Sequence, residues 1–214
     1  YLLHGAGGDE EAWSSMGRTA QILDNLIQKG LAKPMIVVMP NGNPNQQAAQ
    51  TFGLPTTEYD WRNPENRNLY VKSLVEEIVP FIEKNYRTVA KKSHRAIAGL
   101  SMGGMHTLMI TANYPDMFNY IGLYSSGVDF TLIEKGEVPA YANFDGKLAK
   151  LAQTNPKLYW IACGSADGLM PANKQLTERM TKNGLKYTFH ESSRGHLWSN
   201  WRQYSLMFIP QLFK

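Results

Sequence analysis

The sequence predicts an α/β domain with a mostly parallel central sheet and helices on both of its faces. Short apolar runs alternate along the chain with segments of helical period, as strands and crossover helices alternate in parallel sheets. The strand-like runs are apolar throughout, which is typical of strands that are buried on both faces.

Six runs are expected to be strands, and the segments between them supply the helices. The expected strands are Tyr1–Leu3, Met35–Met39, Arg95–Ala98, Tyr120–Tyr124, Leu158–Cys163 and Lys186–His190. The expected helices cover residues 16–29, 69–86, 102–112, 171–183 and 198–209. Gly30 is a typical helix stop, Pro171 fits a first helical turn, and Pro80 should kink the second helix.

Length and composition favour a single domain over residues 1–214. The chain starts at Tyr1 on what looks like the end of a buried strand, so we expect leading strands and any targeting segment to lie outside this sequence. Residues 40–67 and 127–145 show little periodicity. Long irregular segments of this kind often border a binding pocket or form a lid.

The charge pattern argues against nucleic-acid and membrane partners. A net charge of +4 is spread along the chain without a dense basic block, which indicates solvated surface charge. The apolar runs are too short to span a bilayer. We expect no metal or cofactor, because there is no H-E-x-x-H, no cysteine pair and no dinucleotide fingerprint. The single cysteine, Cys163, is expected to be a buried, inert thiol.

The residues Gly99-Leu100-Ser101-Met102-Gly103 form a G-x-S-x-G box between an expected strand and an expected helix. In α/β-hydrolases this context is a nucleophile elbow, a sharp turn that exposes a reactive serine above the sheet. The small glycines keep side chains away from the crowded backbone of such a turn. Because a five-residue pattern alone is a weak signal, the rest of the chain must supply the partners of Ser101.

Two further residues stand where this fold places an acid and a base. In α/β-hydrolases the chain order is Ser, then Asp or Glu, then His. Asp167 follows the expected strand Leu158–Cys163, and His196 follows the last expected strand. Asp129 is an alternative acid, whereas the other aspartates and histidines fit capping, surface or packing roles.

The glycine-rich segment His4-Gly5-Ala6-Gly7-Gly8 follows the first expected strand. Its backbone amides can face an oxyanion, and the second donor of this fold is the amide after the nucleophile. We therefore expect the amides of Ala6 and Met102 to form an oxyanion hole, with Gly5 as the nearest substitute. A phosphate-binding loop is a weaker interpretation, since the G-x-x-x-x-G-K-[ST] pattern is missing.

Four blocks of the chain together resemble the putative-esterase group of α/β-hydrolases, and within it carbohydrate esterase family one. The blocks are L-L-H-G-A-G-G-D-E-E-A-W, P-M-I-V-V-M-P-N-G-N, H-R-A-I-A-G-L-S-M-G-G and G-H-x-W. The resemblance implies Ser101 as nucleophile, Asp167 as acid and His196 as base. It also implies a secreted or periplasmic feruloyl or acetyl-xylan esterase that acts on plant xylan, often fused to a carbohydrate-binding module that is not in this chain.

Apolar and aromatic residues near the expected triad are candidate substrate contacts, because aromatic slots hold flat phenols and stack on sugars. The candidates are Phe52, Trp160, Leu169, Trp198 and Trp201. For the tryptophans, packing in the core is an equally ordinary role.

The sequence thus favours a serine carboxylic-ester hydrolase with an acyl-enzyme mechanism, releasing ferulate or acetate from xylan. The alternatives are an S-formylglutathione hydrolase, a siderophore esterase or an acyltransferase of the same group. A catalytically silent carbohydrate-binding domain on this scaffold is an alternative from a different class.

Overall fold

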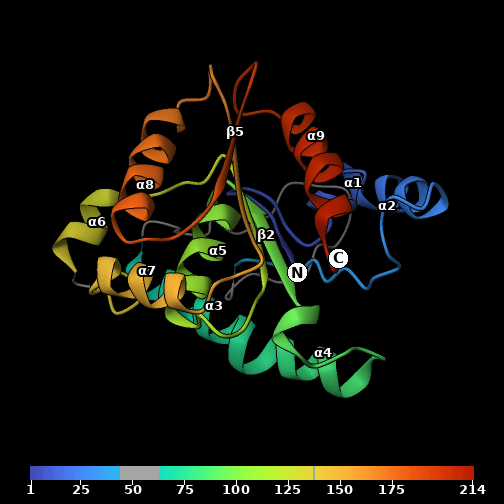
Figure 1. Ribbon diagram of the computed structural model, residues 1–214, viewed down its shortest axis with the longest axis horizontal. Helices are drawn as coiled ribbons and strands as arrows, with labels where there is room; N and C mark the ends of the chain where they lie inside the picture. The colour runs from blue at the N-terminus through green and yellow to red at the C-terminus, as the bar shows by residue number, and fades with distance from the viewer. Residues whose placement is uncertain (44–62, 137) are drawn as a thin grey trace.

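The computed structural model describes residues 1–43, 63–136 and 138–214 (Figure 1). Within them, five parallel strands form one sheet in the order β1-β2-β3-β4-β5. Their bounds are β1 Leu2–Leu3, β2 Ala96–Leu100, β3 Tyr120–Tyr124, β4 Leu158–Gly164 and β5 Thr188–Ser192. The predicted α/β architecture with a mostly parallel sheet is confirmed.

Helices cover both faces of the sheet. Figure 1 shows α6, α7 and α8 on one side of the sheet and α1, α2 and α9 on the other. The bounds are α1 Ala12–Ser15, α2 Thr19–Gln28, α3 Pro64–Ser73, α4 Val79–Asn85, α5 Met102–Asn113, α6 Phe130–Lys135, α7 Phe144–Gln153, α8 Met170–Lys182 and α9 Trp198–Phe208. Three short turns complete the described elements: η1 Leu74–Ile78, η2 Lys92–His94 and η3 Ile209–Gln211.

Strand residues alternate between two apolar cores, one on each face of the sheet. Ile97, Ile121 and Tyr159 lie side by side and join the core under α5, α7 and α8. Their neighbours Ala98 and Trp160 point the other way, into the core under α1 and α9. Strands β1 to β4 are buried on both faces, which explains their apolar sequences, whereas the edge strand β5 is partly exposed and more polar.

The helix expected over residues 69–86 is interrupted in its middle. A π-helical turn at Leu74–Ile78 separates α3 from α4, and Pro80 lies in the first turn of α4. Proline has no amide hydrogen to donate to the preceding turn. The predicted kink at Pro80 therefore takes the form of a widened turn just before it.

The prediction of a strand at Met35–Met39 is wrong, because this segment has no regular secondary structure. A single backbone bond joins this segment to β1, from the Leu2 amide to the Val38 carbonyl at 2.9 Å. The two residues of β1 are too few to build a longer ladder with it.

The irregular stretch 127–145 contains more helix than its composition predicts. It holds all of α6, whose first turn is capped by the Asp129 carboxylate accepting from the Leu132 amide, and the start of α7. Residues 44–62 of the other irregular stretch lie outside the described residues, so a lid there stays a prediction. The single domain over residues 1–214 also stays a prediction. None of the helices in the described ranges has the length and apolarity needed to cross a bilayer.

Candidate active site

Ser101 occupies the sharp turn between β2 and α5 that the G-x-S-x-G box predicts. Its φ of 53° and ψ of −114° are unfavourable for a residue with a side chain. Three backbone bonds hold the turn: the Ser101 amide donates to Tyr124, while the Ser101 carbonyl accepts from Met105 and Gly127, all at 2.9–3.0 Å. The strained turn is thus fixed by the strand beside it and by its own helix.

Glycines let the backbones around this turn approach one another. A Cβ atom at Gly99 would lie 2.2 Å from the Gly103 carbonyl oxygen, and one at Gly103 would lie 2.5 Å from the Leu3 carbonyl oxygen. Both distances are too short for any larger residue. The two fixed glycines of the motif therefore bring β1, β2 and α5 together at the serine.

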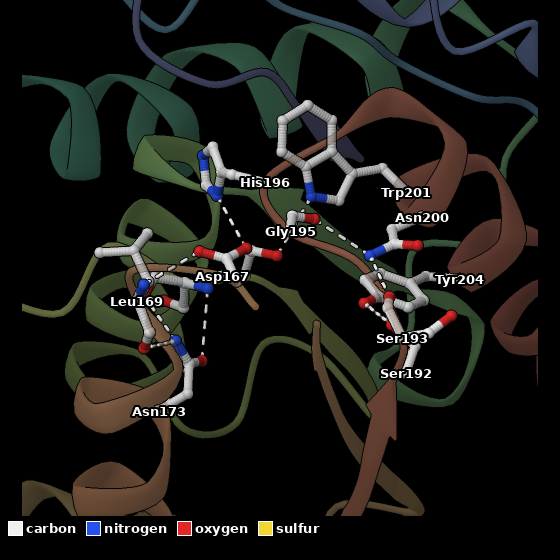
Figure 2. Close-up of polar contacts among 12 residues, drawn as sticks. Asp167, Leu169, Asn173, Ser192, Ser193, Gly195, His196, Asn200, Trp201 and Tyr204 are labelled. Carbon is white, nitrogen blue, oxygen red and sulfur yellow. Dashed lines mark hydrogen bonds and ion pairs between the residues drawn. The ribbon is translucent and has the colours of Figure 1, made fainter. Parts of the chain in front are cut away.

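The structure pairs Asp167 with His196, as predicted. Asp167 Oδ2 lies 2.9 Å from His196 Nδ1, and Asp167 Oδ1 accepts from the Leu169 amide at 2.9 Å (Figure 2). The Asp167 side chain is 1% exposed, whereas that of His196 is 37% exposed. A buried carboxylate that accepts from Nδ1–H leaves Nε2 of the imidazole free to take a proton.

A cavity of about 160 Å³ lies beside Ser101 at the carboxyl ends of the strands, where parallel sheets place their sites. It is lined by Gly5, Ala6, Gly7, Gly8, Ala12, Met16, Leu100, Ser101, His196, Trp198 and Trp201. The structure therefore brings the predicted nucleophile, base and oxyanion loop to one cavity. A larger cavity of about 310 Å³ opens near Tyr1 and Ala96, at the amino ends of the strands, and contains none of these three groups.

The oxyanion loop expected at residues 4–8 packs directly against the serine turn. A Cβ atom at Gly5 would lie 2.6 Å from Leu100 Cδ1 and 3.2 Å from Ser101 Cβ, so glycine permits this approach. Met102, the other expected donor, is the first residue of α5. The first amides of a helix lack intrahelical acceptors and carry partial positive charge.

His4 fastens the oxyanion loop to a neighbouring segment. Its Nε2 accepts from the Gly42 amide at 2.7 Å, and its Nδ1 lies 2.8 Å from the Gly5 carbonyl oxygen. Since Nε2 is the acceptor, Nδ1 carries the hydrogen and donates it to Gly5. Burial lowers the pKa of His4, which keeps the ring neutral in this role.

Aromatic rings support His196 from one side. The Trp201 ring meets the imidazole edge to face, with centroids 4.8 Å apart, and its Nε1 donates to Ser125 Oγ at 3.2 Å. Trp198 contacts Trp201 at 5.1 Å and Trp13 at 5.2 Å. Trp201 is buried, and both Trp198 and Trp201 line the cavity. Their predicted contact with substrate stays a prediction.

The other predicted substrate contacts have different outcomes. Trp160 is 2% exposed and packs against Tyr124, Tyr204 and Phe208, so its prediction as a substrate contact is wrong. Leu169 uses its amide to hold Asp167, and a role for its side chain stays a prediction. Phe52 lies outside the described residues.

Asn173 joins the segment that follows Asp167 to the segment that follows β3, although no motif in the sequence marks it. Its Nδ2 donates to the carbonyls of Leu169 and Ser126 at 2.9 and 3.0 Å, and its Oδ1 accepts from the Ser126 amide at 3.3 Å (Figure 2). Only a polar residue at a buried position of α8 could have drawn attention to it. Asp129, the alternative acid, caps α6 instead.

Cys163 is buried in β4, as expected. Burial, followed by the charge of Asp167, raises its pKa to about 12. Among the described residues, no group of three His, Cys, Asp or Glu side chains is arranged to hold a metal ion.

Known families and proteins resemble the chain over most of its length. The model of the family "Esterase: Putative esterase" matches residues 1–207. An endo-1,4-beta-xylanase/feruloyl esterase of Xylanibacter ruminicola is 44% identical over 127 residues, which are 59% of this chain and 16% of that protein. An esterase of Mycobacterium tuberculosis is 26% identical over 236 residues, covering 92% of this chain and 48% of that protein. The chain therefore corresponds to less than half of either relative.

Solved structures share the fold at lower identity. A ferulic acid esterase of Anaeromyces mucronatus superimposes with a TM-score of 0.77 at 24% identity, covering 100% of this chain and 77% of that one. An S-formylglutathione hydrolase of Staphylococcus aureus gives 0.72 at 19% identity, covering 100% and 80%. These likenesses identify the architecture as the α/β-hydrolase fold.

Proposed function

The chain belongs to the putative-esterase family, whose model matches residues 1–207, and from this premise we propose that it hydrolyses carboxylic esters through Ser101, His196 and Asp167. One observation carries the proposal. The imidazole that is bonded to the buried carboxylate of Asp167 opens onto the same cavity as the strained serine. Nucleophile, base and orienting acid are the three parts that acyl transfer by serine requires.

The first half-reaction forms an acyl-enzyme. His196 Nε2 takes the proton of Ser101 Oγ while that oxygen attacks the ester carbonyl carbon. The resulting tetrahedral oxyanion is held by the amides of Ala6 and Met102. The oxyanion then collapses, the bond to the alcohol breaks, and His196 returns the proton to the departing alkoxide.

The second half-reaction repeats these steps with water. His196 takes a proton from water, the hydroxide adds to the acyl carbon, and the second tetrahedral intermediate expels Ser101, which recovers its proton from His196. The products are the carboxylic acid and free enzyme. Asp167 stays ionised throughout and stabilises the transient imidazolium.

We propose ferulate or acetate esters of xylan or xylo-oligosaccharides as substrates. Apart from the reacting groups and the glycine-rich loop, the cavity is lined by the apolar and aromatic residues Ala12, Met16, Leu100, Trp198 and Trp201, which suits an acetyl or a flat cinnamoyl group. The names of relatives support this choice: a xylanase/feruloyl esterase and an acetyl esterase of Caldicellulosiruptor saccharolyticus. Because xylan is an extracellular polymer, we also propose that the enzyme is secreted or periplasmic and works beside a carbohydrate-binding module.

The test compares Ser101→Ala with the wild type on p-nitrophenyl acetate and methyl ferulate. We expect the substitution to abolish turnover and to abolish labelling by a fluorophosphonate probe. Ser93→Ala is the matched control, because Ser93 is exposed on η2 at the amino end of β2, whereas the cavity lies at the carboxyl end of that strand. Unchanged turnover in Ser101→Ala would end the proposal, and xylan binding without probe labelling would favour a silent carbohydrate-binding domain.

The substrate class is tested by rates on methyl ferulate, acetylated xylan and S-formylglutathione. We expect the two oxygen esters to be preferred over the thioester. A preference for the thioester would favour the S-formylglutathione hydrolase alternative, and ester products formed with an added alcohol would favour an acyltransferase.

A further inference from the structure

The base loop, residues 192–196, presents four consecutive backbone carbonyls, and each of them accepts a hydrogen bond. The carbonyls of Ser192 and Arg194 accept from the amides of Ser165 and Ala166, at 2.7 and 3.0 Å. The carbonyls of Ser193 and Gly195 both accept from Nδ2 of Asn200, each at 3.0 Å. The donors thus alternate between the acid loop, residues 165–167, and one side-chain amide of α9, whose two bonds are drawn in Figure 2.

The Asn200 amide is buried against Gly164. Asn200 is 6% exposed, and a Cβ atom at Gly164 would lie 2.9 Å from its Nδ2 and 2.3 Å from the Arg194 carbonyl oxygen. The amide therefore occupies a space that only glycine leaves open. A carboxamide has two hydrogens on one nitrogen, so it can serve both carbonyls at once.

The loop needs such support because its backbone is strained next to the base. Arg194 has a φ of +71°, in the left-handed region that a residue with a Cβ rarely adopts. The carbonyl of Gly195 belongs to the peptide group that leads directly into His196. Rotation of that peptide would move the imidazole relative to Asp167.

We propose that Asn200 is a positioning residue, which holds the base loop so that His196 stays within bonding distance of Asp167. The inference rests on the proposed function, since it takes His196 as the base. Asn200 touches neither the substrate cavity nor the reacting atoms, and it acts through the backbone of the base loop. The acid loop supplies the other two bonds, so acid and base are aligned on the same four carbonyls.

The test is Asn200→Ala, with Asn113→Ala as the matched control. Asn113 is a partly buried asparagine on α5 whose Nδ2 also donates to two backbone carbonyls, those of Met109 and Ala140 at 2.8 and 3.0 Å. Small displacements of catalytic groups cost up to about 10²-fold in rate. We expect Asn200→Ala to lower kcat roughly 10- to 100-fold with KM within about twofold, and Asn113→Ala to leave both unchanged.

A second readout reports on the acid–base pair without any substrate. The proton shared by His196 Nδ1 and Asp167 should give a downfield NMR signal in the wild type and in Asn113→Ala. We expect this signal to broaden or vanish in Asn200→Ala. Because the signal does not depend on turnover, it separates a failure of this inference from a failure of the proposed function.

Should Asn200→Ala fail to fold, a glycine pair decides the question by the same two readouts. In Gly164→Ala the new methyl group would displace the Arg194 carbonyl and the Asn200 amide, whereas a Cβ atom at Gly168 meets nothing within 4 Å. We expect Gly164→Ala to lose kcat and the downfield signal, and Gly168→Ala to keep them. An unchanged kcat and a retained signal in Asn200→Ala, or in Gly164→Ala, would overturn the proposal, as would equal losses in the controls.

Discussion

Replacing Asp167 with asparagine should stop catalysis while leaving the shape of the site intact. In the wild type both carboxylate oxygens are acceptors, Oδ1 from the Leu169 amide and Oδ2 from His196 Nδ1, each at 2.9 Å. Asparagine has one acceptor oxygen and one donor nitrogen. Because the Leu169 amide can only donate, the side-chain oxygen must face it, and the NH2 group must face His196.

This orientation forces the wrong tautomer on the base. His196 Nδ1 must then accept a hydrogen bond, so the ring hydrogen moves to Nε2. With this hydrogen in place, Nε2 can no longer take the proton of Ser101. In a serine protease with the same arrangement, the wrong tautomer costs about 10⁴ in turnover. We therefore expect Asp167→Asn to lower kcat about 10⁴-fold, which corresponds to roughly 5.5 kcal/mol of activation free energy.

The assay is steady-state hydrolysis of methyl ferulate and p-nitrophenyl acetate at neutral pH, with thermal unfolding as a check on folding. Asp129→Asn is the matched control, because Asp129 caps α6 and asparagine caps helices equally well. Its kcat should stay within about twofold of the wild type. Asp167→Asn with kcat within about tenfold of the wild type, or a larger loss in Asp129→Asn, would refute the assignment of the acid.

Three further predictions test the surroundings of the site. Gly5→Ala should lower kcat on p-nitrophenyl acetate by about 10²-fold, because the methyl group pushes the loop and its Ala6 amide away from the serine turn. Burial lowers the pKa of His4 in the folded protein, so the imidazole takes up a proton at a higher pH in the unfolded chain than in the folded one. The free energy of unfolding, measured in urea, should therefore decrease as the pH is lowered through about 6.5. This decrease should be less steep in His4→Gln than in the control His94→Gln. Iodoacetamide should label native Cys163 at least ~10³-fold more slowly than the unfolded chain, since its pKa is about 12 and it is fully buried. Rapid labelling of the native protein would contradict this packing.

The placement of the candidate catalytic residues was largely predictable from the sequence, because these residues follow directly after strands. The positions of Ser101, Asp167 and His196 follow from a turn motif and from the order of apolar runs. These signals are local in the chain, and a parallel sheet gathers the carboxyl ends of its strands at one edge. The pairing of Asp167 with His196 needed nothing further.

The environment of Trp160 could not be read in the same way. Trp160 of β4 pairs with Gly122 of β3, which in turn pairs with Ala98 of β2. Phe208 packs against both Gly122 and Trp160. Its ring fills space that these small residues leave, so it belongs to the core. Strand register and the facing helix decide this, and neither is encoded near position 160.

The segment Met35–Met39 has the composition of a strand, but its partner β1 offers only two residues.

Asn173 and Asn200 show a different limit. Each bonds to backbone carbonyls, so no complementary side chain elsewhere in the sequence points to it. Their hydrogen bonds depend on how two loops are placed relative to a helix in the folded protein. Sequence patterns identify groups that do chemistry more readily than groups that hold a backbone in place.

The edge-to-face tryptophans also make the site accessible to intrinsic fluorescence measurements. Three of its five indoles, Trp13, Trp198 and Trp201, touch in series and end at the imidazole of His196. Excitation absorbed by one ring can pass to the next at such separations, so a quencher beside Trp198 would darken several emitters together. A cinnamic acid absorbs where indoles emit, which would let its arrival and departure be followed by intrinsic fluorescence, with no dye attached.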